Sequence, residues 1–409
     1  MLTYVFIAVI VINFLVDWVL DKLNASRFEA ELPSELDGLY DANEYKKSIN
    51  YKKVNYKFSS VVSLVSVLVT LGFLIFGGFE WADSLARTWS SNPVWMALLF
   101  FGIIGLGSEL LNTPFSYYKI FVIEENFGFN KQTLKVFITD KLKSWALGVV
   151  LGGLILVAVL KIYEWFGIYF WWYAWILLTL FSIFMNLFYT KLIVPLFNKQ
   201  APLGAGLLKY KIEGYAQKVG FAVKNIFVID GSKRSTKGNA YFSGFGKQKR
   251  ITLYDTLIQN LNEDEIVAVL AHEVGHYKKK HIVYQLLISV LTSGLTLFLL
   301  SLFLSKPEFS LAIGVTTPSF HVGLVSFVIL YSPISLVLGM IGNIVSRKFE
   351  FQADAYAKST FEPKVLAEAL KKLSKGSLNN LTPHPAYVFF NYSHPPVDQR
   401  IRKLKRIDI

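Results

Sequence analysis

Seven transmembrane helices and one small α+β region outside the bilayer form the fold that this sequence predicts: a mainly α-helical, polytopic membrane protein. The composition indicates this class, because 53% of the 409 residues are hydrophobic and only 17% are charged, more apolar than a soluble core of this size needs. Seven apolar stretches, each about twenty residues long, can cross a bilayer. They are residues 2–20, 58–79, 94–112, 145–163, 168–190, 283–304 and 322–345.

The first stretch sets the expected orientation. It begins at Met1, with no basic segment before it and no small-residue cleavage site after it, which predicts an uncleaved anchor whose N-terminus lies outside. Lys and Arg in the connections agree, since cytoplasmic loops carry the positive excess. Loops 21–57 and 113–144 hold seven and five of these residues, whereas loops 80–93, 164–167 and 305–321 hold one, none and one.

The polar segments 198–282 and 347–409 are also rich in Lys and Arg, so we place both segments, and the C-terminus, on the cytoplasmic side. The net charge of +13 is therefore mostly a topology signal. Its basic residues are spread beside the spans and do not gather in one patch, so we expect a lipid bilayer and no nucleic acid as partner. The chain has no cysteine, which excludes disulfides, Cys-ligated zinc and thiol catalysis.

These boundaries divide the chain into four parts. Residues 1–197 hold the first five transmembrane helices with their cytoplasmic loops, and residues 198–282 form a cytoplasmic α+β region. Residues 283–346 hold the last two transmembrane helices, and residues 347–409 form a cytoplasmic C-terminal helical region. We expect this last part to be helical through about Lys375 and to end in a basic helix.

Region 198–282 combines one helix with short strands. A Gly-containing connection, 243–249, predicts that the last two strands form a hairpin. Asn262 stands three places before Glu265, which predicts a capping box at the start of the next helix. The expected helix covers residues 207–219, and the expected strands cover residues 225–230, 239–242 and 250–254.

The capped helix carries the motif His272-Glu273-Val274-Gly275-His276. Two histidines four places apart lie on one helix face and can bind a single zinc ion, while the glutamate between them is turned aside to hold a water. Gly275 would leave the helix face near the metal open. The same five-residue pattern also occurs by chance in helices that bind no metal. A third ligand is therefore needed to identify a zinc site.

A catalytic zinc site takes three protein ligands and leaves the fourth position for water. Two membrane crossings return the chain to the face that bears His272, which favours the segment after the last span. Glu350 and Asp354 are four apart there, so one carboxylate can bind metal while the other accepts the N–H of a ligand histidine. Further candidates on this side are His281, His384 and His394.

We therefore expect one zinc ion per chain, bound by His272, His276 and Glu350. Zinc would activate water and polarise a peptide carbonyl, and Glu273 would act as the general base of peptide hydrolysis. The alternative for Glu350 is a solvated carboxylate paired with Arg347 or Lys348. The alternative for Asp354 is an ordinary acid on the helix surface.

Several further motifs accompany these residues in the same order as in one family. With them, the chain resembles the type I CAAX prenyl endopeptidases, integral-membrane zinc metalloproteases, over nearly its whole length. The motifs are Glu124–Gln132, Gly238–Phe242, Lys249–Thr256, Ala271–His276, Ser346–Asp354 and Ser393–Pro396.

The resemblance implies a seven-helix membrane protein that encloses a large water-filled chamber, with the zinc site facing its interior. It implies the same ligands and the same catalytic Glu273. It further places Asn239 and Tyr241 on a strand that pairs with an extended substrate backbone, and His394 and Arg400 near the oxyanion. The alternatives are a strand-start role for Asn239 and a loop histidine that caps backbone for His394.

Members of this family cleave the terminal tripeptide after a prenylated cysteine, and bacterial relatives are associated with membrane-protein quality control. The resemblance thus implies a prenylated or membrane-associated peptide or protein substrate, with general quality control as the alternative. The chain is short for a eukaryotic member, and its end, Arg406–Ile409, is not a dilysine retrieval signal. We expect the cytoplasmic membrane of a bacterium, or the endoplasmic reticulum membrane if the protein is eukaryotic.

Two other classes compete with this interpretation. A transporter or channel would also suit seven spans and intramembrane polar residues such as Glu109, Asn186 and Asn343, but it predicts no stoichiometric zinc. The heat-shock-type membrane metalloproteases share the zinc motif but have fewer spans.

Overall fold

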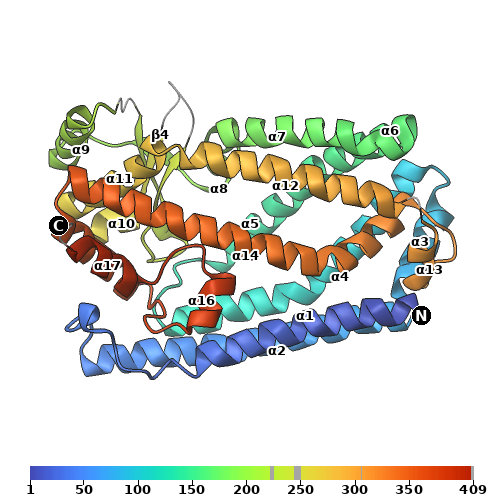
Figure 1. The fold of residues 1–409 in the computed structure, drawn as a ribbon, viewed down its shortest axis with the longest axis horizontal. Helices are drawn as coiled ribbons and strands as arrows, with labels where there is room; N and C mark the ends of the chain where they lie inside the picture. Colours follow the sequence, from blue (N-terminus) through green and yellow to red (C-terminus); the bar gives the residue numbers. More distant parts are fainter. Residues whose placement is uncertain (222–224, 244–249, 305, 407–409) are drawn as a thin grey trace.

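The computed structural model describes residues 1–221, 225–243, 250–304 and 306–406. Helices dominate these ranges, and the longest of them run along the long axis of the molecule (Figure 1). The first part contains α1 (Leu2–Ala25), α2 (Ala42–Ile75), α3 (Gly78–Trp89), α4 (Pro93–Tyr118), α5 (Leu134–Leu147), α6 (Gly153–Phe166), α7 (Phe170–Leu192) and α8 (Val194–Phe197). The rest contains β1 (Gln200–Pro202), α9 (Leu207–Lys218), β2 (Ile226–Ile229), β3 (Ala240–Ser243), β4 (Arg250–Tyr254), α10 (Asp255–Asn260), α11 (Glu263–Lys278), α12 (His281–Leu304), α13 (Glu308–Ala312), α14 (Phe320–Thr360), α15 (Pro363–Gly376), α16 (Pro385–Asn391) and α17 (Val397–Lys405).

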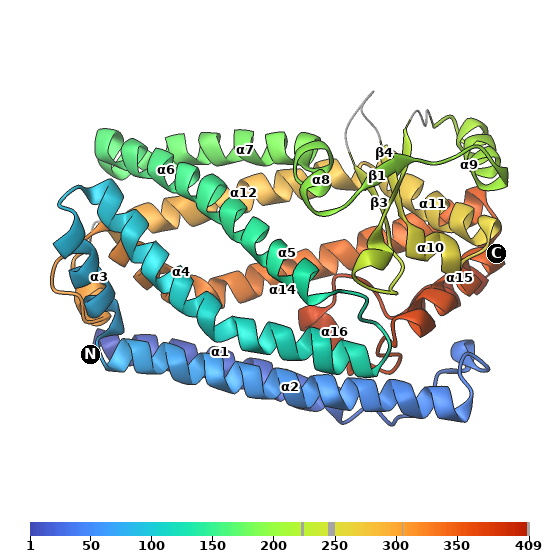
Figure 2. The same ribbon diagram turned by 180° about the vertical axis from the view of Figure 1, so that it is seen from behind.

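Six helical stretches of the described chain are long and apolar enough to cross a membrane. Each of the seven predicted spans overlaps one of them, and spans 145–163 and 168–190 share the fourth stretch, Leu134–Phe197. That stretch folds back at Gly167, whose φ is +53°, so that α6 and α7 pack side by side (Figure 2). The predicted polytopic, mainly α-helical fold is confirmed.

The second helix differs most from its predicted span, 58–79. It begins at Ala42, behind a capping box in which Asp41 and Glu44 bond each other's backbone N–H, and it ends at Ile75. The reason for the early end is Gly77, whose φ of +72° is the left-handed conformation that stops a helix. The first turns of α2 are polar, so a prediction based on hydropathy could not include them in the span.

The loops predicted to lie outside gather at one end of the molecule, and the polar regions gather at the other (Figures 1 and 2). The N-terminus, α3, α13 and the turn between α6 and α7 share the first end, while the sheet, α9, α11 and α17 share the second. This arrangement matches the relative topology that the charge pattern predicts.

The membrane helices leave most of their apolar surface uncovered by the rest of the described chain. In their most apolar windows only 6% to 22% of the residues are buried. On α4, Ser108 and Asn112 are exposed although they lie in a span, and Glu109 forms an ion pair with Lys141 of α5. Polar groups at this depth require water or a partner, and Lys141 is the partner of Glu109. The water-filled chamber stays a prediction.

Among the described residues, the sheet has four strands in the order β1-β2-β4-β3. Strands β3 and β4 pair antiparallel, as the hairpin prediction requires, with Ala240 opposite Leu253. Their connection, 244–249, lies outside the described residues. Strand β1, which pairs antiparallel with β2, was not predicted, because it is three residues long and contains a proline. Strand β3 therefore lies at one edge of the sheet.

Helix α11 is the centre of the polar region and is buried along most of its length. It packs against α9, α14 and α15, and Ile266, Leu270 and Val274 are each at most 2% exposed. Its capping box forms as predicted, with Asn262 and Glu265 bonding each other's backbone N–H at 2.9 Å. The motif residues thus stand on a helix that its surroundings hold on several sides.

Gly275 lets α11 approach α14 closely. A Cβ built at Gly275 would lie 2.9 Å from the backbone oxygen and 3.0 Å from the Cα of Ala353. The expectation that this glycine leaves the metal-facing side open is therefore wrong, since its hydrogen faces the neighbouring helix. The backbones of α11 and α14 touch at Gly275 and Ala353. This contact lies within one helical turn of the motif histidines on α11 and of Glu350 on α14.

We predict that Gly275→Ala destabilises the protein by about 1–3 kcal/mol, the usual cost of overpacking, because the added methyl meets backbone that cannot rotate away. Thermal unfolding of the detergent-solubilised protein would measure this. Gly214, inside α9, is the matched control, since a Cβ there meets nothing within 4 Å. Gly214→Ala should be neutral or stabilising by up to about 1 kcal/mol. Equal melting temperatures for Gly275→Ala and the wild type would contradict the close contact.

Candidate metal centre

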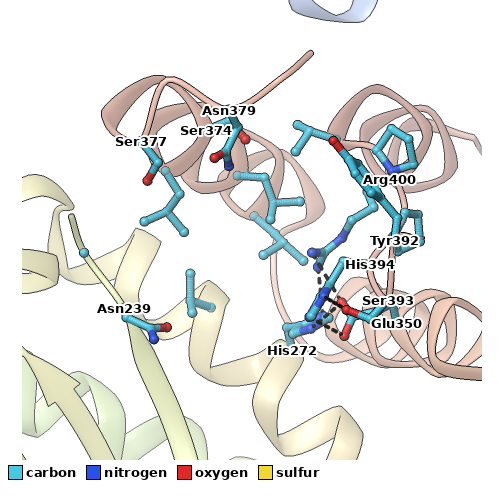
Figure 3. Close-up of a pocket in the computed structure, with 18 of the residues that line it drawn as sticks. Asn239, His272, Glu350, Ser374, Ser377, Asn379, Tyr392, Ser393, His394 and Arg400 are labelled. Carbon is cyan, nitrogen blue, oxygen red and sulfur yellow. Dashed lines mark hydrogen bonds and ion pairs between the residues drawn. The ribbon is translucent and has the colours of Figure 1, made fainter. Parts of the chain in front are cut away.

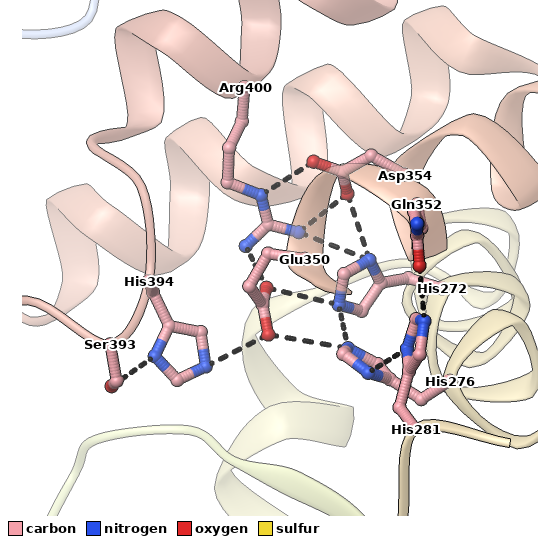
Figure 4. A network of polar contacts seen from close by, with 9 residues as sticks. All are labelled: His272, His276, His281, Glu350, Gln352, Asp354, Ser393, His394 and Arg400. Carbon is pink, nitrogen blue, oxygen red and sulfur yellow. Dashed lines mark hydrogen bonds and ion pairs between the residues drawn. The ribbon is translucent and has the colours of Figure 1, made fainter. Parts of the chain in front are cut away.

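The two motif histidines and Glu350 point their donor atoms at one another (Figure 4). The Nε2 atoms of His272 and His276 lie 3.1 Å apart. The Glu350 carboxylate places Oε2 3.4 Å from His272 Nε2 and Oε1 3.3 Å from His276 Nε2. All three residues offer a ligand atom within 4.8 Å of the others.

These spacings fit one tetrahedral zinc ion. With ligands at about 2.0–2.1 Å, the donors of a tetrahedral site lie about 3.3 Å from each other. Glu350 is only 4% exposed, and its Oε2 atom has no hydrogen-bond partner among the described residues. A buried carboxylate oxygen without a donor is costly unless a cation satisfies it.

Helix α14 supplies Glu350 because it continues unbroken through the last predicted span to Thr360. The alternative pairing of Glu350 with Arg347 does not form. Arg347 instead donates from Nη1 to the carbonyl oxygens of Val388 and Tyr392, at 3.0 and 2.5 Å. It thereby holds the end of α16 against α14.

Asp354 orients His272 from the side away from Glu350. His272 donates from Nδ1 to Asp354 Oδ1 at 2.8 Å, so that Nε2 is the nitrogen turned toward a metal. Arg400 of α17 donates two hydrogen bonds to the same carboxylate, from Nε to Oδ2 at 2.9 Å and from Nη2 to Oδ1 at 2.7 Å. Its third nitrogen, Nη1, lies 3.4 Å from Glu350 Oε2. Asp354 is 2% exposed, so it is no surface acid.

Two opposing influences act on the protonation of His272. Burial and the Arg400 charge favour the neutral ring. The hydrogen bond to Asp354 and the Glu350 carboxylate 3.4 Å from Nε2 outweigh them and raise the pKa of His272 to about 9. Without a metal, the ring is therefore protonated at neutral pH. A metal ion must displace this proton when it binds.

A second relay orients His276. His281 Nε2 donates to Gln352 Oε1 at 2.8 Å, so its Nδ1 atom is an acceptor. That atom lies 3.0 Å from His276 Nδ1, which donates to it and keeps its own Nε2 free. The His281 ring is 1% exposed and stacks on Phe349 at 4.2 Å. His281, itself a candidate ligand in the sequence analysis, thus lies behind the candidate ligand His276 and contacts it.

The turn between α11 and α12 makes this relay possible. Lys280 has a φ of +59°, a left-handed conformation that costs about 1–2 kcal/mol for a residue with a Cβ. It reverses the chain so that His281, the first residue of α12, points back at His276. The spacing alone could not reveal this, because a continued helix would turn His281 away.

A cavity of about 580 Å³ opens in front of the cluster (Figure 3). It is lined by His272 and Glu273 on one side and by Asn239 and Ala240, at the start of β3, on another. Asn239 is exposed, and its Oδ1 accepts from the backbone N–H of Ala240 at 2.8 Å. The edge strand and the candidate general base therefore face the same space.

Two of the other predicted residues also border this cavity, in different ways. His394, 66% exposed at its side chain, places Nε2 3.2 Å from Glu350 Oε1 and accepts or donates to Ser393 at Nδ1. Arg400 is 8% exposed and directs its nitrogens at the carboxylates. His384 lies elsewhere, since it caps α16 by accepting from Ala386 N at 3.2 Å.

Tyr241 points away from the cluster. It pairs with Thr252 in the register of β3 and β4, so its side chain lies on the sheet face opposite that of Ala240. Its ring packs edge-on against Tyr254 at 6.4 Å. Any contact of Tyr241 with a substrate on the edge strand therefore falls to its backbone.

The sequence does not predict the contact of Gln352 with His281, and it suggests Arg347 only as a partner of Glu350. Gln352 and Arg347 both lie on α14 near the candidate ligand Glu350, but their partners come from α12 and α16. Arg347 is three places before Glu350, and Gln352 is two places after it. Neither spacing predicts, in a single sequence, a contact with α16 or α12.

Two family models match the chain in succession. Residues 22–199 match the model described as CAAX prenyl protease N-terminal, five membrane helices, and residues 202–408 match peptidase family M48. Together they cover almost the whole chain.

Curated relatives match at similar length. The chain is 38% identical to CAAX prenyl protease 1 homolog of Arabidopsis thaliana, over 91% of this chain and 90% of that protein. It is 38% identical to CAAX prenyl protease 1 of Saccharomyces cerevisiae, over 92% and 89%, and 33% identical to the human CAAX prenyl protease 1 homolog, over 91% and 88%. The crystal structure of S. mikatae Ste24p superposes with a TM-score of 0.94 at 35% identity, over 99% of both chains.

The raised pKa of His272 predicts that metal binding releases a proton. Between about pH 6 and the folded pKa of about 9, the affinity for zinc should rise about tenfold per pH unit. The reason is that the fraction of molecules with an unprotonated His272 rises about tenfold per unit in this range. Zinc titration calorimetry in two buffers of different ionisation enthalpy would count the protons released. A pH-independent affinity would contradict the protonated ring.

The relay predicts that His281→Phe weakens zinc binding by about 10- to 100-fold, since the ring stack on Phe349 remains while the acceptor for His276 is lost. Competition with a zinc chelator would measure the dissociation constant. His384→Ala is the matched histidine control and should bind zinc as the wild type does. Unchanged affinity in His281→Phe would show that His276 needs no such partner.

Proposed function

Because the chain belongs to peptidase family M48 and, within it, to the CAAX prenyl proteases, we propose that it hydrolyses peptide bonds with one zinc ion held by His272, His276 and Glu350. The protein is a multi-pass membrane metalloendopeptidase, so its family decides against the transporter alternative. The observation that carries the ligand choice is the convergence of three donors within 4.8 Å.

The base for this reaction is Glu273. When bound, zinc lowers the pKa of a water to about 7 and polarises the peptide carbonyl. Glu273 lines the cavity directly beside His272, so its carboxylate takes the water's proton and delivers it to the leaving amine. The Asp354 and His281 bonds keep both imidazoles in the tautomer that presents Nε2.

The substrate backbone adds to the free edge of β3. This strand is the last in the sheet order, and its start at Asn239 and Ala240 lines the cavity that holds Glu273. An extended peptide bonded there by β-augmentation would bring its scissile carbonyl into the cavity beside Glu273 and His272. The Asn239 side chain adds an amide contact at the same edge.

His394 and Arg400 take different parts in this proposal. His394 is exposed and 3.2 Å from Glu350 Oε1, so its ring can turn an N–H toward the oxyanion of the tetrahedral intermediate. Arg400 has its nitrogens committed to Asp354 and Glu350. It is a positioning residue, which neutralises two buried carboxylates and holds them in place.

We propose a prenylated or membrane-associated peptide as substrate, with the site and the C-terminus facing the cytoplasm. The charge pattern of the loops supports this side. Helix α11, which carries His272 and His276, lies at the end of the molecule that carries the sheet. A bacterial cytoplasmic membrane stays a prediction, with the endoplasmic reticulum membrane as the counterpart in a eukaryote.

Glu273→Gln should retain zinc but lose peptide cleavage by at least about 10³-fold, because the amide cannot accept the water's proton. Metal analysis and the rate of peptide cleavage would be measured on the same purified sample. Glu263→Gln, in the first turn of the same helix, is the control and should cleave normally. Retained peptide cleavage by Glu273→Gln would contradict the role of Glu273 as general base.

Substrate class is tested by mass spectrometry of the products from three probes. A farnesylated peptide, its unmodified twin and a misfolded membrane protein would be incubated with the same enzyme. Release of a C-terminal tripeptide from the farnesylated probe alone is the expected result. Cleavage of all three at several positions would favour general quality control.

A further inference from the structure

A second cavity, of about 480 Å³, adjoins the one at the metal centre. The two share Ser377, Asn379 and Asn380 as lining residues. Figure 3 shows Ser377 and Asn379 across the first cavity from His272 and Glu350. The second cavity therefore begins where the first one ends, on the side away from the metal ligands.

Lys52 of α2 lines this second cavity and is buried without a counter-charge. Its side chain is 7% exposed, and it forms no ion pair among the described residues. Its contacts are the Phe28 carbonyl oxygen at 3.5 Å and the rings of Phe28 and Tyr45, each 5.7 Å from Nζ. A buried ammonium without an anion destabilises the protein. Binding of an anionic ligand beside Lys52 would offset this cost.

The other charged residues of the cavity differ from Lys52. Lys237 is already neutralised, since its Nζ lies 2.8 Å from Glu124 Oε2 and 3.0 Å from the Tyr51 hydroxyl. Asp21, the acid that lines the cavity, makes no ion pair with Lys52. Lys52 is thus the available positive charge in this part of the described chain.

A second polar group in the cavity also lacks a partner. The Oδ1 atom of Asn55, one turn after Lys52, is buried with no hydrogen bond among the described residues, although Nδ2 donates to the Tyr51 carbonyl at 2.8 Å. Asn55 thus offers an acceptor beside the Lys52 donor. A carboxylate that follows a peptide N–H carries the matching pair of groups.

The direction of β3 brings the C-terminal end of a substrate to this place. A strand added antiparallel to β3, the more stable pairing, runs from Ser243 toward Asn239 and leaves the sheet beside Lys237, which lines the second cavity. Three residues of extended peptide span about 10 Å. An antiparallel partner that advances three places from Ala240 arrives opposite Lys237.

We propose that the second cavity binds the free C-terminal carboxylate of the peptide substrate, with Lys52 as its counter-charge and Asn55 as acceptor for the last peptide N–H. This inference rests on the proposed peptidase function. Lys52 and Asn55 would then be the residues that set the distance between the chain end and the scissile bond, because they hold the carboxylate at one point.

The test compares one peptide as a C-terminal acid and as its carboxamide. In the wild type, kcat/KM for the acid should exceed that for the amide by about 10- to 100-fold, the range for a bond to a charged group. Lys52→Met should remove the preference, so that the ratio of kcat/KM for the acid to kcat/KM for the amide falls to about one. Equal rates for both peptides in the wild type, or an unchanged preference in Lys52→Met, would overturn the proposal.

Two variants control this result. Lys53→Met removes the neighbouring lysine, which is 48% exposed and pairs with Glu29 outside the cavity, and it should keep the wild-type preference. Lys52→Arg keeps the charge and should retain most of the preference. Loss of preference in Lys53→Met would show that overall charge, and not the cavity, selects the acid.

A binding measurement separates this inference from the peptidase function. The dissociation constants of a tripeptide acid and its amide can be measured by calorimetry on the wild type, where no cleavage is needed. Tighter binding of the acid by about 10-fold or more supports the subsite, even if the protein cleaved neither probe. Equal dissociation constants would exclude it, even if the protein were an active peptidase.

Discussion

The backbone contact between α11 and α14 is the constraint on which the candidate site depends. Gly275 and Ala353 touch so closely that a methyl group has no room between them. Since His272 and His276 flank the first residue and Glu350 and Asp354 flank the second, their separation follows from this contact. A looser packing would move the carboxylates beyond the reach of the imidazoles, and the donor set would no longer fit one ion.

Charge balance explains the shell around the donors. Glu350 and Asp354 are both nearly inaccessible, and two buried carboxylates side by side repel each other. Arg400 spans them, and the metal that we propose would supply the remaining positive charge. The two imidazoles are held from behind by Asp354 and by the relay from Gln352 through His281. Each ligand is thus oriented before a metal arrives.

Local periodicity was enough to predict the parts of this site that lie on one helix. The four-residue spacings of His272 with His276 and of Glu350 with Asp354 determine their shared faces. The contacts of Gly275, His281 and Gln352 escaped prediction, because each depends on how two distant segments pack or on an unusual φ at Lys280. The spans were visible in hydropathy, but their ends depend on caps such as Gly77.

X-ray absorption spectroscopy at the zinc edge, on the purified full-length protein, tests the central claim most directly. One zinc per chain should appear, with two imidazole nitrogens and a carboxylate oxygen at about 2.0–2.2 Å and one further light atom. Glu350→Gln should change this shell while His384→Ala should not. A shell without two imidazoles, or a spectrum that Glu350→Gln leaves unchanged, would contradict the account.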